Sequence, residues 1–270
     1  MFGQASQHLY RAMVSVLPCR PLLMEYAFLE QAYWDSQAER VEALRQRIAN
    51  RAATAAGRVV PDDADLSIGT GRRLRLTVLF IDISGFSSRK SSTADEQELM
   101  LRVLNLFMTE MIKVIEDYGG QVEKNTGDGL MAYFEDSADY NSTIKAVSCA
   151  LTMHAANDNL IAPVLRATAF EPLQFRVSLD CGFVTIARIG AAQRFNANVA
   201  IGNTANFAAK MLPNVSPGAI GLGANAQQRL PEVWRNTWTQ LSPVSTGWVF
   251  GDSSVPYPLY LYTGRWAKAL

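Results

Sequence analysis

LRLTVLFIDI, residues 74–83, is an almost unbroken run of apolar and β-branched side chains. A run of this kind is typical of a strand that is covered on both faces. Asp82 places a carboxylate at the end of that strand, which is costly unless the charge is paired or binds a metal ion. The stretch therefore predicts a central strand with a polar site at its end.

The segments after this strand alternate between helical and extended patterns. Their order, strand-helix-strand-strand-helix-strand, is that of the ferredoxin-like split unit, in which an antiparallel sheet is covered by helices on one face. We therefore predict an α+β domain. The predicted elements are a helix over 95–118, strands over 121–124 and 130–134, a helix over 142–157, strands over 173–179 and 183–189 flanking a turn at Asp180, a helix over 204–212, a strand over 219–222, a helix over 224–229, and strands over 247–249 and 259–263.

The first 68 residues differ from the rest of the chain. They predict a short helix over 4–16 and a long helix over 22–56, and the glycine, proline and aspartate residues of 57–71 indicate a linker. The long helix is either an arm that packs on a partner subunit or a cover for its own domain. We expect an N-terminal helical extension and linker over 1–68, followed by a second domain over 69–270.

The bulk composition argues against several classes of protein. The 25 basic and 25 acidic residues cancel, whereas a nucleic-acid-binding surface usually brings a basic excess. The three cysteines are far apart and form no CxxC pair, so a disulfide framework or zinc site is not expected. No run reaches the about 18 apolar residues of a membrane span, and the chain starts without a secretory signal. We expect a cytoplasmic protein that binds neither nucleic acid nor membrane.

A second aspartate, Asp128, lies between two glycines at the tip of the predicted hairpin, within KNTGDGLMAYF. In a split unit this hairpin neighbours the first strand, so Asp82 and Asp128 can lie side by side. Adjacent carboxylates repel unless a cation lies between them, which is the basis of a two-metal site for phosphoryl chemistry. Taken singly, Asp82 could cap the next segment and Asp128 could be ordinary turn chemistry. The turn of residues 84–87 contains Gly85 and leads toward a helix, so its backbone N–H groups suit phosphate oxygens.

Four motifs occur in a characteristic order: LTVLFIDISGF, VEKNTGDGLMAYF, FRVSLDCGFVTIARIG and AIGNTANFAAKML. Together they resemble the catalytic domain of class III adenylate and guanylate cyclases, over about residues 72–229. The resemblance implies a homodimer of head-to-tail domains with shared active sites. One subunit would supply the metal carboxylates, and the other would supply base-recognition and transition-state groups.

The resemblance also implies a role for each matched position, and two Mg²⁺ or Mn²⁺ ions in each active site. The substrate would be a nucleoside triphosphate. The implied metal ligands are Asp82, Asp128 and the backbone carbonyl of Ile83; Gly85 and Phe86 match the triphosphate loop, Arg176 matches a triphosphate-binding arginine, Lys124 a base-selecting lysine, Asn206 the asparagine that orients the ribose, and Lys210 the position of a transition-state arginine.

Three positions depart from the pattern. Val199 stands where adenylate cyclases usually have an aspartate that accepts a hydrogen bond from adenine, and an apolar side chain cannot accept that bond. Lys210 keeps the positive charge of the expected arginine but loses its planar fork. No residue of 247–255 clearly matches the C-terminal triphosphate lysine of the family.

Base selection follows from Lys124, which only donates hydrogen bonds and so suits a base carbonyl. FIDISGFSSR and VAIGNTANFAAKML also resemble the bacterial pyrimidine cyclases of Pycsar antiphage systems, which make cyclic UMP or cyclic CMP for a separate effector protein. Uracil has two carbonyls, so UTP is favoured. Cytidylate, adenylate and guanylate cyclase activities stay open. A protein of another class, a catalytically inactive cyclase-like module for nucleotide sensing or dimerisation, is the remaining alternative.

Overall fold

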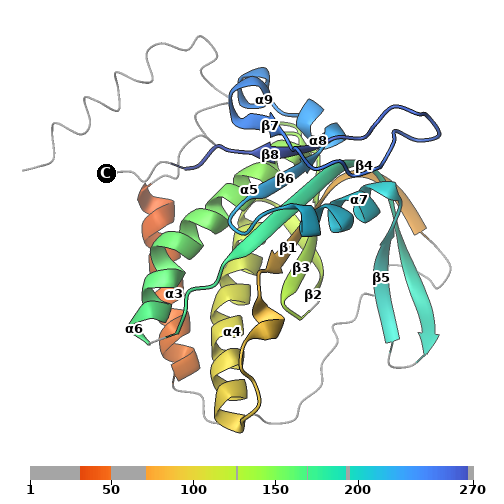
Figure 1. The fold of residues 1–270 in the computed structure, drawn as a ribbon. Helices are drawn as coiled ribbons and strands as arrows, with labels where there is room; N and C mark the ends of the chain where they lie inside the picture. The colour runs from red at the N-terminus through yellow and green to blue at the C-terminus, as the bar shows by residue number, and fades with distance from the viewer. Residues whose placement is uncertain (1–30, 50–70, 126, 169, 193–194, 267–270) are drawn as a thin grey trace, which may run out of the picture.

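The computed structural model describes residues 31–49, 71–125, 127–168, 170–192 and 195–266 of the chain. Within them, eight strands form one sheet that is packed between helices (Figure 1). Along the chain the elements are α3 (Gln31–Ala49), β1 (Gly71–Ile83), η1 (Phe86–Ser88), α4 (Ala94–Asp117), β2 (Gly120–Asn125), β3 (Gly129–Glu135), α5 (Ser142–Ala156), η2 (Asn157–Ile161), α6 (Ala162–Ala167), β4 (Phe175–Ala192), β5 (Phe195–Ile201), α7 (Asn203–Met211), η3 (Leu212–Asn214), β6 (Ile220–Gly223), α8 (Ala224–Gln228), α9 (Glu232–Trp238), β7 (Thr239–Leu241) and β8 (Leu259–Tyr262).

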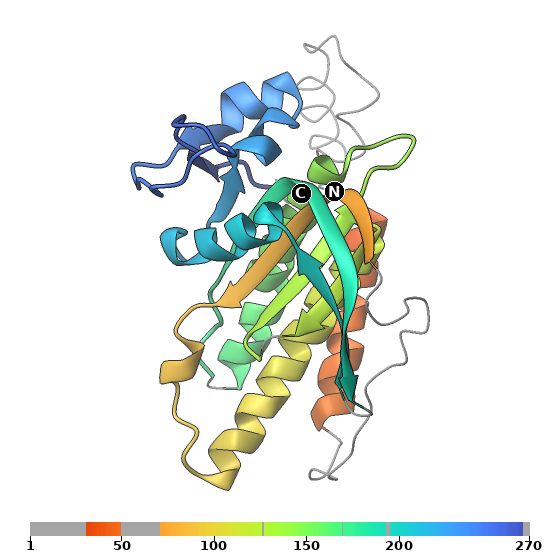
Figure 2. The ribbon, with the colours of Figure 1, turned by 90° about the vertical axis from the view of Figure 1, so that its right-hand side faces the viewer.

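The sheet has the strand order β2-β3-β1-β4-β6-β8-β7. Its first four strands are antiparallel neighbours, which confirms the predicted ferredoxin-like core with β1 inside it. Beyond that core, β6 pairs with β4 in parallel, so the complete sheet is mixed. β5 pairs with the end of β4, and the two project from the sheet as a ribbon in Figures 1 and 2.

Side chains of β1 alternate between two hydrophobic cores. Leu79 and Ile81 join the larger core, which holds α4 and α5 on one face of the sheet. Leu76 and Val78 join a smaller core on the opposite face, where α7 packs. The predicted helices on one face are therefore α4 and α5, and α7 adds a cover on the other face. Because both faces of β1 are covered, its sequence reads as a continuous apolar run rather than an alternating one.

Local chemistry sets the start of α4, the long helix beside the sheet. Thr93 accepts a hydrogen bond from the amide of Glu96 at 3.2 Å, and Glu96 accepts one from the amide of Thr93 at 3.0 Å. This reciprocal capping box satisfies N–H groups that the first helical turn leaves free. The helix then buries Phe107 and Met111 against the sheet. Its predicted bounds, 95–118, agree with the observed Ala94–Asp117 to within one residue.

The predicted turn at Asp180 is wrong, because β4 continues without interruption from Phe175 to Ala192. Gly182 keeps its place in the ladder opposite Leu76 of β1. A side chain at this position would collide with Thr204 at the start of α7. The glycine lets strand β4 and helix α7 approach each other closely. A glycine in a turn looks the same in the sequence, which explains the wrong prediction.

The end of the chain also differs from expectation. The predicted strand over 247–249 does not form; Val249 makes an isolated bridge with Pro256 instead. The strand at Leu259–Tyr262 is confirmed. The short elements β5, β7 and α9 were not predicted; β5 pairs with β4, the strand before it, and β7 pairs with β8, the strand after it.

Helix α3 packs against α4 of the same chain, so its described part covers its own domain. Arg40 forms ion pairs with Glu110 at 3.2 Å and with Asp117 at 3.5 Å. Tyr33 donates a hydrogen bond to Asp117 at 2.8 Å. The predicted short helix over 4–16, the outer parts of the long helix and the linker over 57–70 lie outside the described residues. None of the described helices has the length and hydropathy needed to cross a membrane.

Candidate active site

The two predicted metal aspartates lie on neighbouring strands at one end of the sheet. Asp82 is opposite Gly129 in the β1–β3 register, one residue beyond Asp128. The amide of Ile83 donates to the carbonyl oxygen of Asp128 at 3.0 Å, which ties the hairpin tip to the end of β1. Gly127 reaches a φ of 95°, a conformation that favours glycine, and so turns the chain tightly before Asp128.

Arg176 contacts the first of these carboxylates. It is opposite Asp82 in the β1–β4 register. Its Nε and Nη2 atoms each lie 2.8 Å from Asp82 Oδ2, and about a quarter of each side chain is exposed, 26% and 27%. Such charge-assisted hydrogen bonds are strong, and they fix the orientation of the carboxylate. No other described residue bonds the Asp82 side chain, so its Oδ1 atom stays available for a ligand.

The predicted triphosphate turn follows β1 directly. Gly85 has a φ of 68°, in the left-handed region, and starts the short helix η1. The first hydrogen bond of this turn is from Ser88 N to Gly85 O, so the amides of Phe86 and Ser87 precede it. Phe86 and Asp128 line one small pocket of about 350 Å³. Backbone donors and an aspartate therefore meet at one cavity, an arrangement that suits a phosphate with a bound cation.

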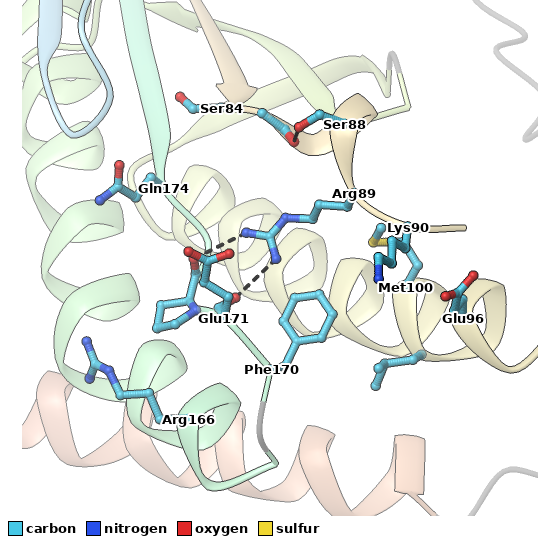
Figure 3. Close-up of a pocket in the computed structure, with 13 residues that line it drawn as sticks. Ser84, Ser88, Arg89, Lys90, Glu96, Met100, Arg166, Phe170, Glu171 and Gln174 are labelled. Atoms are coloured by element: carbon cyan, nitrogen blue, oxygen red, sulfur yellow. Dashed lines mark hydrogen bonds between the residues drawn. The ribbon is translucent and has the colours of Figure 1, made fainter. Parts of the chain in front are cut away.

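Arg89 supports this turn and was not among the predicted site residues. Its guanidinium donates to the backbone carbonyl oxygens of Glu171 at 3.2 Å and Pro172 at 3.3 Å. It also lies 5.0 Å above the ring of Phe170 (Figure 3). Arg89 lines both the small pocket and a larger one of about 880 Å³ on the other side of the turn. Its sequence signal is a cation just beyond the glycine turn, in GFSSR.

The donor atoms at this end of the sheet fit a hard divalent cation. Asp82 and Asp128 offer carboxylate oxygens, and Mg²⁺ is commonly held by one or two carboxylates plus substrate phosphates. Across the described residues, no three side chains of the His, Cys, Asp and Glu types gather as a closed metal cage. Metal binding at Asp82 and Asp128 would therefore need further oxygen ligands from a substrate. We call Asp82, Asp128, Arg176 and the turn at Gly85 and Phe86 the β1 cluster.

The base-selecting positions lie elsewhere, on β2 and β5. The amide of Ala200 in β5 donates to Glu123 Oε1 in β2 at 3.2 Å. This bond joins the residue before Lys124 to the residue after Val199, so it links the two strands that carry these positions. The side chain of Val199 is half-buried, and that of Lys124 lies outside the described part of the structure. Glu123 was not predicted, since its partner is 77 residues away.

Asn206 and Lys210 both lie on α7 and are exposed. They are four residues apart, so they share one face of the helix. The opposite side of α7 is buried through Ala205 and Ala208 against the sheet. Neither Asn206 nor Lys210 lines the two pockets beside the β1 cluster. We call Lys124, Val199, Asn206 and Lys210 the outer group.

The predicted site residues therefore form two sets within one chain. The β1 cluster offers carboxylates, a cation and backbone donors, which can hold a phosphate group together with metal ions. Of the outer group, Asn206 and Lys210 are exposed on α7, and Val199 of β5 is half-buried. A ferredoxin-like core with two carboxylates at the end of its central strands and a glycine turn beside them is the arrangement that the resemblance to class III cyclases implies.

Comparison with known proteins agrees with this class. Residues 71–245 match the Adenylate and Guanylate cyclase catalytic domain, and the chain belongs to this family. It is 30% identical over 179 residues to a uridylate cyclase of Burkholderia cepacia, covering 64% of this chain and 75% of that protein. It is 29% identical over 150 residues to an adenylate cyclase of Anabaena cylindrica, covering 54% of this chain but only 28% of that protein.

The fold is similar to that of solved cyclases. The adenylyl cyclase CyaB from P. aeruginosa superposes with a TM-score of 0.58 at 23% identity, covering 74% of this chain and 99% of that structure. At this level of identity, the likeness supports the fold alone.

Proposed function

We propose that this protein converts UTP to cyclic UMP and pyrophosphate. The observation that carries the proposal is the β1 cluster, in which Asp82 and Asp128 lie at adjoining strand ends and Arg176 orients Asp82. A cyclase-like domain freed from catalysis would have little use for both carboxylates in this geometry. The catalytic unit would be the domain over 69–270, with 1–68 as an extension whose α3 covers the domain.

In the proposed reaction, the ribose 3′-oxygen attacks the α-phosphorus, and the bond to the bridging oxygen of the pyrophosphate breaks. Two Mg²⁺ or Mn²⁺ ions, when bound, would lower the pKa of the 3′-hydroxyl and offset charge on the phosphates. Asp82, Asp128 and the Ile83 carbonyl would hold these ions. The amides of the turn at Gly85 and Phe86 bind phosphate oxygens.

The remaining residues act on orientation and charge. Arg176 holds Asp82 in place and adds positive charge beside the phosphates. Asn206 orients the ribose so that its oxygen is aligned for attack. Lys210 stabilises the negative charge that develops on the α-phosphate and the leaving group. Each of these groups acts without becoming covalently bound to the substrate.

Separation of the two sets of residues supports a shared site. Asn206 and Lys210 point outward from α7 and do not line the pockets beside Asp128. A head-to-tail homodimer would place the outer group of one subunit over the β1 cluster of the other, and its two-fold symmetry would create two equivalent sites.

Base choice rests on Lys124 and Val199, whose strands the Glu123–Ala200 bond links. A lysine donates to a base carbonyl and valine accepts nothing, which favours uracil over adenine. The relative named uridylate cyclase supports this choice, although the family also contains adenylate cyclases. Cyclic UMP would then act as a messenger for a separate effector protein in bacterial antiphage defence.

The test is to incubate the purified protein with ATP, GTP, CTP or UTP and Mn²⁺ or Mg²⁺, and to separate the products beside cyclic standards. Cyclic UMP from UTP, absent in the Asp128→Ala variant, is the expected result. Formation of cyclic CMP, AMP or GMP would refute the choice of uracil but would still support the proposed cyclisation reaction. Binding of a triphosphate without any cyclic product would favour the inactive sensing or dimerisation module.

A further inference from the structure

Residues 248–257 form a short hairpin next to α7 (Figures 1 and 2). The amide of Tyr257 donates to Trp248 O at 2.7 Å, and the amide of Phe250 donates to Val255 O at 2.9 Å. Asp252 is the only charged residue of this hairpin. It includes most of the segment in which no residue matches the family's triphosphate lysine, so its role must come from packing rather than from a cation.

The hairpin encloses one side chain of α7. The ring of Phe207 stacks on Trp248 at a centroid distance of 5.1 Å and an angle of 17°. It also stacks on Tyr257 at 4.8 Å and 29°. Phe250 contacts the same Tyr257 ring at 4.6 Å. Phe207 is therefore held by two aromatic rings that both belong to the hairpin.

Tyr257 anchors the hairpin to the sheet. Its side chain is buried, and its hydroxyl oxygen lies 2.7 Å and 2.8 Å from the two carboxylate oxygens of Asp180 in β4, to which its single proton is donated. The amide of Asn225 donates to the same hydroxyl oxygen at 3.1 Å. Asp180 is buried, and its carboxylate occupies the space beside Gly223 of β6 that a side chain at that position would fill.

Phe207 follows Asn206 directly and lies three residues before Lys210 on α7. A rigid helix turns as one body, with about 100° between successive residues. Fixing the Phe207 ring therefore fixes the direction in which Asn206 and Lys210 point. Ser178 of β4 adds a hydrogen bond to the carbonyl oxygen of Ala208 at 2.6 Å, and Ala205 and Ala208 pack on the sheet. The aromatic contacts of Phe207 hold the side of α7 next to these buried residues.

We propose that the hairpin of residues 248–257 is a positioning element, in which Trp248 and Tyr257 hold Phe207 and so aim Asn206 and Lys210 at the substrate. The proposal rests on the proposed cyclase function for its catalytic consequence. Its structural consequence, a helix α7 whose order depends on Trp248, does not require any activity.

The test compares Trp248→Ala with Trp248→Phe and with Val255→Ser. Val255 is 56% exposed in the same hairpin, so its substitution is a matched control. Because a small misplacement of catalytic groups can cost about 100-fold in rate, Trp248→Ala should lower kcat roughly 10- to 100-fold while KM changes less than about threefold. Trp248→Phe restores a stacking ring and should recover most of kcat, and Val255→Ser should match the wild type.

Amide hydrogen exchange of residues 203–211 supplies the second measurement. Exchange should accelerate in Trp248→Ala, and should stay at the wild-type rate in Val255→Ser. If the wild type makes no cyclic nucleotide, the proposed function fails, and the exchange result still decides whether the hairpin orders α7. Unchanged exchange in Trp248→Ala overturns the positioning role, as does unchanged kcat when the wild type is active. Should Trp248→Ala not fold, Trp248→Leu, which keeps apolar bulk but has no ring to stack on Phe207, replaces it in both measurements.

Discussion

The β1 cluster and the outer group differ in how the chain holds them. Asp82 is fixed by two bonds from Arg176, and Asp128 is tied to β1 through its backbone. By contrast, the side chains of Asn206 and Lys210 make no hydrogen bond with any described residue and point outward. A charge that is partly removed from water at a strand end costs free energy unless it is paired within its own subunit. An exposed polar side chain stays hydrated, so it needs no partner in its own subunit. In the proposed homodimer, one half of the site would come from a single chain, and the other half would come from its partner.

Loss of a carboxylate from the β1 cluster should have the largest effect on the activity. Asp128→Ala removes a metal ligand from the β1 cluster, so kcat should fall about 10³-fold or more, because electrostatic stabilisation is often the largest catalytic contribution. The measurement is cyclic nucleotide formation with Mn²⁺. Asp139→Ala, which changes an exposed acidic residue after β3, should keep wild-type activity. Equal losses in both variants would mean that Asp128 has no special role.

Mixing two inactive variants tests whether the two sets act across subunits. Asp128→Ala inactivates the β1 cluster and Lys210→Ala inactivates the outer group. A mixed dimer therefore contains one intact site and one site with both defects. Half of the dimers in an equal mixture are mixed, so activity should return to about a quarter of the wild-type value.

The matched control for this experiment mixes Asp128→Ala with Asp82→Ala. Both substitutions lie in the β1 cluster, so each site of a mixed dimer lacks one carboxylate and no activity should return. Recovery in both mixtures, or in neither, would contradict a site that combines the β1 cluster of one subunit with the outer group of the other.

A smaller effect is expected for Arg89, which follows the turn of the β1 cluster and ties it to the segment at Glu171 and Pro172. Arg89→Ala removes its bonds to the carbonyl oxygens of Glu171 and Pro172. The turn should lose its orientation toward the phosphates, and KM for the triphosphate should rise about tenfold, as for the loss of one charge-assisted hydrogen bond. Lys90→Ala, an exposed neighbour in the same pocket, should change KM much less. Steady-state kinetics that show equal changes in the two variants would refute this role.

The smallest effect concerns Asp180, a carboxylate that the proposed reaction does not use. Burial raises its pKa to about 7, despite the opposing effect of hydrogen bonds from Tyr257 and the Cys181 amide. The folded pKa is above the unfolded one, so the folded state holds an extra proton between them. The stability that this proton contributes is fully present below about pH 4 and is lost as the pH rises through 7.

Asp180→Asn removes this dependence, because an amide does not titrate. The free energy of unfolding of the wild type should therefore fall relative to that of the variant, by about 1.4 kcal/mol per pH unit between pH 5 and 7. Urea unfolding of both proteins at pH 5, 6, 7 and 8.5 gives this difference. Asp252→Asn, an exposed change in the hairpin, is the control. A constant difference between the wild type and Asp180→Asn across this range would contradict the raised pKa.

Several features could be predicted from neighbouring residues alone. The strand at 74–83 follows from its continuous apolar run and the helix at 95–118 from apolar periodicity, and the hairpin at Asp128 follows from its flanking glycines. The order of these elements was sufficient for the ferredoxin-like core, and it places Asp82 beside Asp128. These features depend on local backbone preference and on which side chains must leave water, and both are encoded within a few residues of each position.

Other features depended on contacts between distant segments. Gly182 looked like a turn but is a strand residue that makes room for Thr204. The acceptors of Arg89 are about 80 residues away, and the rings that hold Phe207 are about 40 to 50 residues away. The sequence by itself determined the central strands and the main helices of this protein and the positions of its two carboxylates, because local patterns of burial and conformation specify them. Only the tertiary structure decided which face α7 covers, that Arg176 holds Asp82, and that Phe207 stacks on Trp248 and Tyr257, because packing and hydrogen bonding join residues that have no relation along the chain.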